Sequence, residues 1–281
     1  MPSQSALVHT FNGIPFSTRS SKELLHTLDS FEAREDDVLL VSYPKSGTHW
    51  LAEILKNLYR TQQGANGCGT VTLTSPIEFG DPSKYEDLRN LPSPRLIPTH
   101  LNYKMLPVQL KTKKCKMIYI IRNPKDTAVS LYHYYKDNPN LPTVDKWTTF
   151  LEKFLNGDGH CILSHFPFYN ETFVLEFSLQ DPTESVEQIS TFLGVNLTSE
   201  QIDDITRKSS FNEMKEQAQK EKVDANNTVC ALTSNKRLIF RKGTVGDWKN
   251  HFSTRQNKLF DERFGERMNS SELAKSIEYE S

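Results

Sequence analysis

Short apolar runs alternate with amphipathic segments along this chain. Residues 37–42 form an apolar run rich in β-branched side chains, which is typical of a buried parallel strand. Residues 95–101 and 116–121 have the same character. Residues 48–60 carry apolar side chains at helical spacing, which predicts an amphipathic helix with an apolar face made of Trp50, Leu51, Ile54, Leu55 and Leu58. The alternation predicts an α/β fold: a single domain, residues 1–281, with a mostly parallel central sheet flanked by helices.

Other segments have weaker patterns. Residues 1–20 are predicted to be a loop, and the prolines within residues 70–95 predict irregular structure of the kind that often lines a binding site. Residues 216–240 are charged and polar, so they form either a mobile lid or a solvated helix followed by a loop. Further helices are predicted at residues 21–31, 142–156, 183–193 and 199–209, and after the turn at Asn123-Pro124.

Composition narrows the possible functions. The 281 residues are long enough to bury one full core, and 34 basic against 35 acidic residues give a net charge of −1. This balance gives no general attraction to nucleic acid or to an anionic membrane, so any anion site must be local. The four cysteines lack C-x-x-C spacing, and no acidic cluster resembles a metal site. With no signal sequence or membrane-spanning window, we expect a cytosolic protein without a metal.

The segment Tyr43–Trp50 (Y-P-K-S-G-T-H-W) lies between a predicted strand and a predicted helix. In a strand–turn–helix of this kind, backbone N–H groups converge on an anion and the helix dipole favours it. Lys45 adds a positive charge, while Ser46, Gly47 and Thr48 keep the approach open and supply hydroxyls. The lysine precedes the glycine, which disfavours an ordinary kinase or GTPase loop. The segment therefore predicts a P-loop-like cradle for phosphate or sulfate, rather than an ordinary βα turn.

Three other positions carry candidate chemistry. His100 follows a short apolar strand, at the edge where parallel sheets bind ligands, although it can also be an ordinary core or turn histidine. Arg122 ends the next strand, and Ser130 follows one turn into the helix after it, which indicates a second anion site or merely a capped helix. Arg241 and Lys242 precede a glycine, as in an anion clamp or a surface turn. Two phosphate sites at successive strand ends imply a doubly phosphorylated, dinucleotide-sized ligand.

These motifs resemble those of the cytosolic sulfotransferases. The octet resembles the family's 5′-phosphosulfate loop Y-P-K-S-G-T-T-W, with His49 in place of the second threonine. R-N-P-K-D-x-A-V-S, from Arg122, and R-K-G-x-x-G-D-W-K, from Arg241, resemble its two 3′-phosphate segments. Thr99-His100-Leu101 resembles the segment of its general base, with Pro98 in place of a lysine that contacts the transferring group.

The resemblance implies transfer of a sulfuryl group from 3′-phosphoadenosine 5′-phosphosulfate (PAPS) to a hydroxyl or amine of a small apolar acceptor, such as a phenol, steroid, iodothyronine or xenobiotic. It implies His100 as the base, Lys45 as the group that offsets charge on the leaving phosphate, and Asp126 and Asp247 as supporting groups. The aromatics Phe16, Phe79, Tyr85 and Tyr132 are expected near the acceptor. The residues implied in binding PAPS are Lys45, Ser46, Gly47, Thr48, His49, Trp50, Arg122, Ser130, Ser209, Phe211, Met214, Arg241, Lys242 and Gly243.

Two departures from the family pattern leave alternatives open. Residues 157–180 diverge and are shorter, and Leu175 stands where the family has a nucleotide-contacting tyrosine. The alternative function is therefore a sulfotransferase-like protein that binds the nucleotide but has impaired or lost activity. A P-loop kinase of unusual order is a further alternative, which predicts dependence on ATP and Mg²⁺. A homodimer is possible, but Lys258 reverses the charge at the acidic end of the family's dimer peptide.

Overall fold

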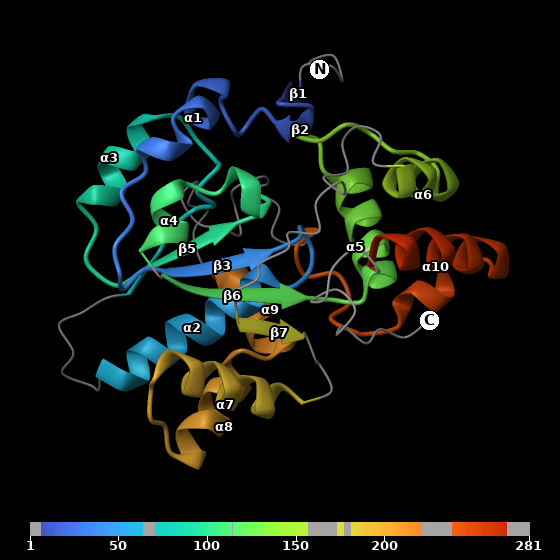
Figure 1. Ribbon diagram of the computed structural model, residues 1–281. Coiled ribbons are helices and arrows are strands. Elements are labelled where there is room, and N and C mark those ends of the chain that lie inside the picture. The colour runs from blue at the N-terminus through green and yellow to red at the C-terminus, as the bar shows by residue number, and fades with distance from the viewer. Residues whose placement is uncertain are drawn as a thin grey trace.

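A five-stranded parallel sheet forms the centre of the molecule (Figure 1). The computed structural model describes residues 7–63, 71–113, 115–156, 173–176, 181–220 and 238–268. The strands are β3 (Val38–Ser42), β4 (Thr72–Leu73), β5 (Arg95–Thr99), β6 (Lys116–Ile121) and β7 (Phe173–Glu176). Their order in the sheet is β4-β5-β3-β6-β7, and each pairs in parallel with its neighbours. The predicted α/β fold with a parallel sheet is confirmed.

The central strand β3 is buried on both faces, as its continuous apolar sequence predicts. Because side chains alternate along a strand, Leu39 and Val41 enter one hydrophobic core while Val38 and Leu40 enter the other. The register places Leu40 beside Pro98 of β5 and Ile118 of β6. The loops that follow β3, β5 and β6 therefore meet at one edge of the sheet.

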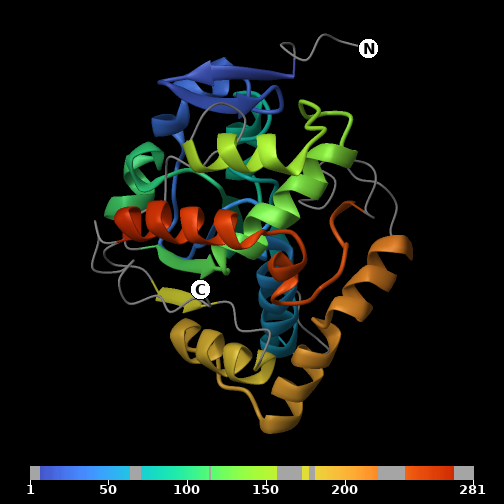
Figure 2. The ribbon, with the colours of Figure 1, turned by 90° about the vertical axis from the view of Figure 1, so that its right-hand side faces the viewer.

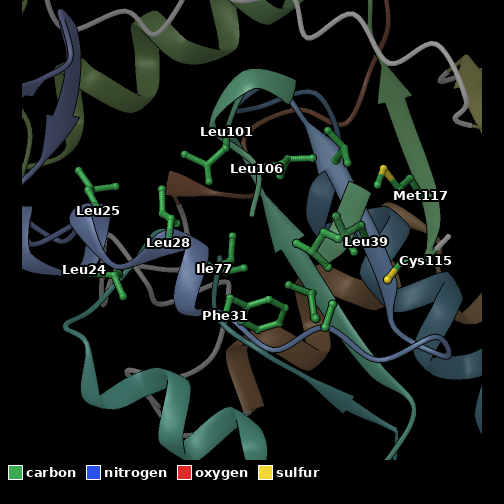
Figure 3. Close-up of a cluster of buried hydrophobic side chains, with 14 of the residues drawn as sticks. Leu24, Leu25, Leu28, Phe31, Leu39, Ile77, Leu101, Leu106, Cys115 and Met117 are labelled. Carbon is green, nitrogen blue, oxygen red and sulfur yellow. The ribbon is translucent and has the colours of Figure 1, made fainter. Parts of the chain in front are cut away.

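Helices cover both faces of the sheet (Figure 1). Figure 3 shows Leu24, Leu25, Leu28 and Phe31 near Ile77 on one side of the sheet. The helices on this face are α1 (Lys22–His26), η2 (Leu28–Ser30), α3 (Ser83–Arg89), η3 (Tyr103–Met105) and α4 (Val108–Thr112). Those on the other face are α2 (Thr48–Gln63), α7 (Pro182–Leu193), α8 (Ser199–Lys208) and α9 (Phe211–Lys220).

A third group of helices lies at the carboxyl end of the strands. It consists of α5 (Pro124–Asp137), α6 (Trp147–Asn156), η6 (Asp247–Asn250) and α10 (Thr254–Met268). Figure 2 shows α10 lying across this end of the molecule. Phe150 and Phe154 of α6 pack with Phe260 of α10 in an aromatic cluster. The buried Lys125 Nζ lies 2.6 Å from Asp261 Oδ1, so an ion pair ties the start of α5 to α10.

The opposite end of the sheet is fixed by a buried ion pair. Arg95, the first residue of β5, donates from Nε to Asp37 Oδ1 at 2.8 Å and from Nη2 to Asp37 Oδ2 at 2.6 Å. Arg95 also donates to the carbonyl oxygens of Leu88 and Glu32. Because Asp37 immediately precedes β3, this two-pronged pair holds β3 and β5 side by side.

Two sequence-based predictions for residues 1–31 are wrong. Residues 1–20 are not a loop throughout, since β1 (Val8–Phe11) and β2 (Ile14–Ser17) form an antiparallel hairpin. Asn12 and Gly13 have φ of +50° and +76°, and Asn-Gly is a strong hairpin signal that four-residue strands make easy to overlook. The predicted helix 21–31 is divided into α1 and η2 at Thr27, whose hydroxyl donates to the carbonyl of Leu24.

Parts of two predicted segments lie outside the described residues. Of the predicted lid, residues 216–220 belong to α9 and residues 221–237 are not described. Of the divergent segment 157–180, the described part is β7, which extends the sheet beside β6. The side chain of Leu175 is outside the description. No helix among the described residues is long and apolar enough to cross a membrane.

Candidate active site

A cavity, here called the sheet-edge cavity, opens at the carboxyl ends of β3, β5 and β6. This is the edge at which open parallel sheets bind ligands. The predicted site residues that line it are Lys45, Ser46, Gly47, Thr48, His49, Trp50, His100, Arg122, Ser130, Phe211, Met214, Arg241, Lys242 and Gly243. Segments distant in the sequence are thus brought to one place, while the individual roles of these residues stay predictions.

Ser209 is the predicted site residue that does not line this cavity. It caps the end of α8, where its backbone N–H donates to the carbonyl of Ile205 at 2.9 Å. Its hydroxyl is buried and finds no partner among the described residues. The predicted contact of Ser209 with the ligand stays a prediction.

The cradle residues adopt an unusual backbone conformation. Lys45 has φ of +71° and Gly47 has φ of +121°. A left-handed conformation costs a non-glycine residue about 1–2 kcal/mol, and strain of this kind is concentrated at functional sites. The turn leads directly into α2, whose first N–H groups have no partner within the helix. The Ser42 and Thr48 hydroxyl oxygens, 2.6 Å apart, close the base of the cradle.

Lys45 lies among other cations. Its Nζ is 4.6 Å from the centre of the Tyr134 ring and 3.4 Å from the carbonyl oxygen of Leu238. Burial, followed by the charges of Arg122 and Arg241, lowers the pKa of Lys45 to about 7. An anion bound here would reverse this effect by pairing with the ammonium group. The buried Nε atoms of Arg122 and Arg241 also find no partner among the described residues, which fits a site built for an anionic ligand.

The Arg241-Lys242 pair is organised by two carboxylates. Arg241 Nη2 donates to Asp247 Oδ2 at 2.6 Å, and Lys242 Nζ donates to Asp247 Oδ1 at 2.5 Å. Burial by itself would raise the pKa of Asp247, but the hydrogen bonds from Lys242 and Arg241 outweigh it and hold that pKa far below its usual range. Asp126 accepts from the backbone N–H groups of Gly246 and Trp248 at 2.7 and 3.0 Å. Both carboxylates therefore support the clamp, as the sequence predicted.

Gly243 lies closer to the Phe211 ring than a residue with a Cβ atom could. Its φ is +69°, and a Cβ atom added there would lie 2.3 Å from Cγ of Phe211. Phe211 Cγ belongs to a ring packed edge-on against Phe240, so it is not the movable end of a flexible chain. The glycine thus allows the Phe211 ring to reach the wall of the cavity.

Gly243→Ala is expected to lower the affinity for 3′-phosphoadenosine 5′-phosphate (PAP), the desulfated form of the PAPS that the resemblance implies, by about tenfold or more, since overpacking costs about 1–3 kcal/mol. Calorimetric titration with PAP measures the change. Gly246→Ala is the matched control, because Gly246 has φ of +83° but an added Cβ would meet nothing within 4 Å. An equal loss of PAP affinity in the two variants would show that backbone strain, not contact with Phe211, weakens binding.

A second cavity adjoins the first and is here called the hairpin cavity. The β1–β2 hairpin contributes Val8, Ile14 and Phe16 to its wall. Pro44, Phe79, His100 and Tyr134 line both cavities. His100 therefore stands where the two cavities meet.

The position of His100 is fixed by hydrogen bonds. Its Nδ1 lies 2.9 Å from the carbonyl oxygen of Ser42. Because a carbonyl can only accept, Nδ1 carries a proton in this contact and the neutral ring presents Nε2 as the acceptor. The backbone N–H of His100 donates to Glu78 Oε1 at 2.8 Å, and the Thr99 hydroxyl donates to Glu78 Oε2 at 3.0 Å. The buried carboxylate of Glu78 thereby orients the backbone that carries the histidine.

The four aromatic residues expected near the acceptor divide into two pairs. Phe16 and Phe79 line the hairpin cavity. Tyr85 and Tyr132 line neither of the two cavities and belong to hydrophobic cores, where Tyr85 packs edge-on against Phe31 and Tyr132 against Trp147. Sequence reasoning missed Tyr134, which lines both cavities and was detectable from its position one helical turn beyond Ser130.

The parallel sheet, the cradle after its central strand and the cationic clamp define an α/β protein built to hold a ligand with two anionic groups. Residues 35–272 match the family model described as the sulfotransferase domain. The chain therefore belongs to the sulfotransferase family. This confirms the family, the fold and the enzyme class predicted from the motifs, a PAPS-dependent sulfotransferase.

Individual relatives agree with the family model. Mouse sulfotransferase 6B1 is 37% identical over 289 residues, which cover 98% of this chain and 91% of the relative. Bovine sulfotransferase 1A1 is 37% identical over 276 residues, which cover 91% of each protein. The crystal structure of mouse sulfotransferase SULT7A1 complexed with PAP is 49% identical, with a TM-score of 0.84, over 96% of this chain and 97% of that one.

Metal binding is a separate question. In the described ranges, no three His, Cys, Asp or Glu side chains are grouped so that they could hold a metal ion. The expectation that the reaction needs no metal stays a prediction.

Proposed function

We propose that this protein transfers the sulfuryl group of PAPS to a hydroxyl or amine of a small apolar acceptor, such as a phenol, steroid, iodothyronine or xenobiotic. The observation that carries the proposal is the position of His100 at the junction of the two cavities. The sheet-edge cavity has the cations for the donor, and the hairpin cavity has the apolar wall for the acceptor. A base at their junction reaches the acceptor's nucleophile.

The residues of the sheet-edge cavity fit the donor. Lys45 and the N–H groups at the start of α2 suit the 5′-phosphosulfate, while Arg122, Ser130, Arg241 and Lys242 suit the 3′-phosphate. Trp50 and Phe211 line the same cavity and are the aromatic candidates for contact with the adenine. The PAP complex of SULT7A1, which is similar over nearly the whole chain, supports the same ligand here.

When bound, PAPS supplies the activated sulfuryl group. His100 accepts the proton of the acceptor's hydroxyl or amine at Nε2, because Nδ1 is engaged with Ser42. Lys45 and the cradle N–H groups offset negative charge on the leaving phosphate oxygen. Arg122, Arg241 and Lys242 hold the distant phosphate and so orient the reacting end.

The hairpin cavity supports an apolar acceptor with few polar groups. Its wall includes Ile14, Phe16, Met105, Leu131 and Leu141. Pockets for small molecules are characteristically apolar, with a few polar groups that fix orientation. The polar groups here include His100 and Asn102. We therefore place the acceptor's nucleophile at the His100 end of this cavity.

The first test is thermal unfolding with PAP, adenosine 5′-phosphate and ATP. A ligand of the folded state raises the midpoint, so PAP is expected to raise it clearly. Adenosine 5′-phosphate lacks the 3′-phosphate and is expected to have a much smaller effect, as is ATP with Mg²⁺. The second test is transfer of labelled sulfate from PAPS to a panel of phenols, steroids and amines.

The same assays separate the alternatives. Binding of PAP without transfer to any acceptor would support the protein of impaired activity that Leu175 suggests. A midpoint raised by ATP with Mg²⁺ but not by PAP would support the kinase. We also propose a cytosolic location, supported by the free buried thiol of Cys115, which cell fractionation tests. Homodimerisation stays a prediction, to be tested by light scattering.

A further inference from the structure

His49 has a place in the site that the proposed function does not yet use. It is the second residue of α2 and lines the sheet-edge cavity together with Lys45 and His100. Its Nδ1 is buried and finds no hydrogen-bond partner among the residues that the structure describes. An unsatisfied buried polar atom is costly, so such an atom in the wall of a binding cavity indicates a ligand that satisfies it.

The ring of His49 is neutral at physiological pH. Burial, followed by the charges of Lys45 and His100, lowers the pKa of His49 to about 3. The position of His49 in the first turn of α2 also lowers its pKa, because the helix dipole disfavours a cation there. A neutral imidazole has one N–H donor, and a histidine kept neutral at a helix N-terminus can polarise a substrate oxygen.

In the proposed function, Lys45 offsets charge on the leaving phosphate and His100 takes the proton of the acceptor, so these two residues flank the transferring group. The charges of the same two residues lower the pKa of His49. Pro98 stands where the resembled motif has a lysine that contacts the transferring group, and it is buried beside Leu40. The end of β5 therefore places no positively charged side chain next to His100. Arg241 and Lys242 are held by Asp247 at the clamp. A further hydrogen-bond donor that faces the sulfuryl group between Lys45 and His100 would therefore stabilise it during transfer.

We propose that His49 is a further catalytic residue, whose ring N–H donates a hydrogen bond to a non-bridging oxygen of the transferring sulfuryl group. The inference rests on the proposed function. In the reaction, a bond forms between sulfur and the acceptor atom while the bond from sulfur to the 5′-phosphate oxygen breaks. The acceptor's proton passes to His100, and His49 keeps its own proton throughout.

Three variants test the role of His49. His49→Leu removes the donor, while His49→Asn and His49→Gln place an amide N–H near the positions of Nδ1 and Nε2. His26→Leu is the control, because His26 is exposed on α1 and lines neither of the two cavities. The measurements are kcat with PAPS and the phenol that the wild type sulfates fastest, and PAP affinity by calorimetry.

His49→Leu is expected to lower kcat by about 10²-fold, as loss of one preorganised donor does, and to leave the affinity for PAP nearly unchanged. At least one amide variant is expected to recover most of the lost kcat. A readout independent of turnover is the ¹⁵N spectrum of histidine-labelled protein, with His49 assigned by its absence in His49→Gln. The His49 nitrogens are expected at neutral positions at pH 7 and to shift with PAPS but not with PAP.

Three results would overturn the inference. They are a His49→Leu enzyme with the kcat of the wild type, equal losses of kcat and PAP affinity in that variant, and amide variants as slow as His49→Leu. Failure of the proposed function looks different, because the wild type itself then neither binds PAP nor transfers sulfate. Wild-type transfer combined with an unaffected His49→Leu variant rejects the inference alone.

Discussion

Replacing His100 with alanine is expected to lower kcat for sulfation by about 10²–10⁴-fold and to leave PAP affinity nearly unchanged, as loss of a general base does. His100 lies where the two cavities meet, and its contact with Ser42 leaves Nε2 as the acceptor. The hydrogen bond to Glu78 comes from the backbone N–H, so it survives the substitution. Initial rates with saturating PAPS and calorimetry with PAP measure the two quantities.

The exposed His26 again provides the control, and His26→Ala is expected to match the wild type in both measurements. A His100→Ala enzyme with full kcat would show that another group takes the acceptor's proton. A loss of PAP affinity as large as the loss of kcat would show that the sheet-edge cavity itself had changed.

Lys45→Met is expected to lower kcat by about 10²–10³-fold and, without nucleotide, to raise the melting temperature at pH 7. The folded protein holds Lys45 with a pKa of about 7, whereas an unfolded lysine has a pKa of about 10.4. Between these values the unfolded state binds more protons, so the contribution of Lys45 to the free energy of unfolding rises with pH. At and below pH 7 the wild type bears the full cost of burying this charge, which methionine removes.

The stabilisation by Lys45→Met is therefore expected to be largest near pH 7 and to disappear toward pH 10. Scanning calorimetry across this range measures it. Methionine also keeps the left-handed backbone strain at position 45, so strain does not differ between the two proteins. Lys258→Met, which alters a lysine with an 81% exposed side chain, is the control and should leave the melting temperature unchanged.

The same lysine is expected to make PAP binding depend on pH. A phosphate binds the charged form, so affinity should be constant below about pH 7 and fall by up to about tenfold per pH unit above it. Calorimetry in buffers of different ionisation enthalpy should show proton uptake near pH 8. Identical uptake by Lys45→Met would assign the proton to another group.

Local chemistry explains what could be predicted from the sequence. The run Val38–Ser42 is apolar at every position except its last, so it could only be a strand buried on both faces. Asn123 and Pro124 define the start of α5, and the Asn123 side chain accepts from the backbone N–H of Lys125, as expected of a cap. The cradle was recognisable because strand, turn and helix are consecutive in the chain.

Predictions that depended on side-chain packing were less successful. Phe79 and Tyr85 lie six positions apart, before and within α3, yet Phe79 faces both cavities while Tyr85 is buried against Phe31. Tyr132 and Tyr134 belong to the same helix, but only Tyr134 of these two faces the cavities. An aromatic side chain satisfies a core or a ligand pocket equally well, so its sequence position does not decide between them.

The sequence by itself determined the strands β3, β5 and β6, the helix α2 and the turn that joins β3 to α2, because each depends on neighbouring residues and on backbone hydrogen bonding. The tertiary structure alone decided that the hairpin walls a second cavity, that His100 joins the two cavities and that Arg95 is buried against Asp37. It also decided the lowered pKa of Lys45 and of His49. Burial and the charges of residues distant in the chain produce these properties, and both exist only once the chain has folded.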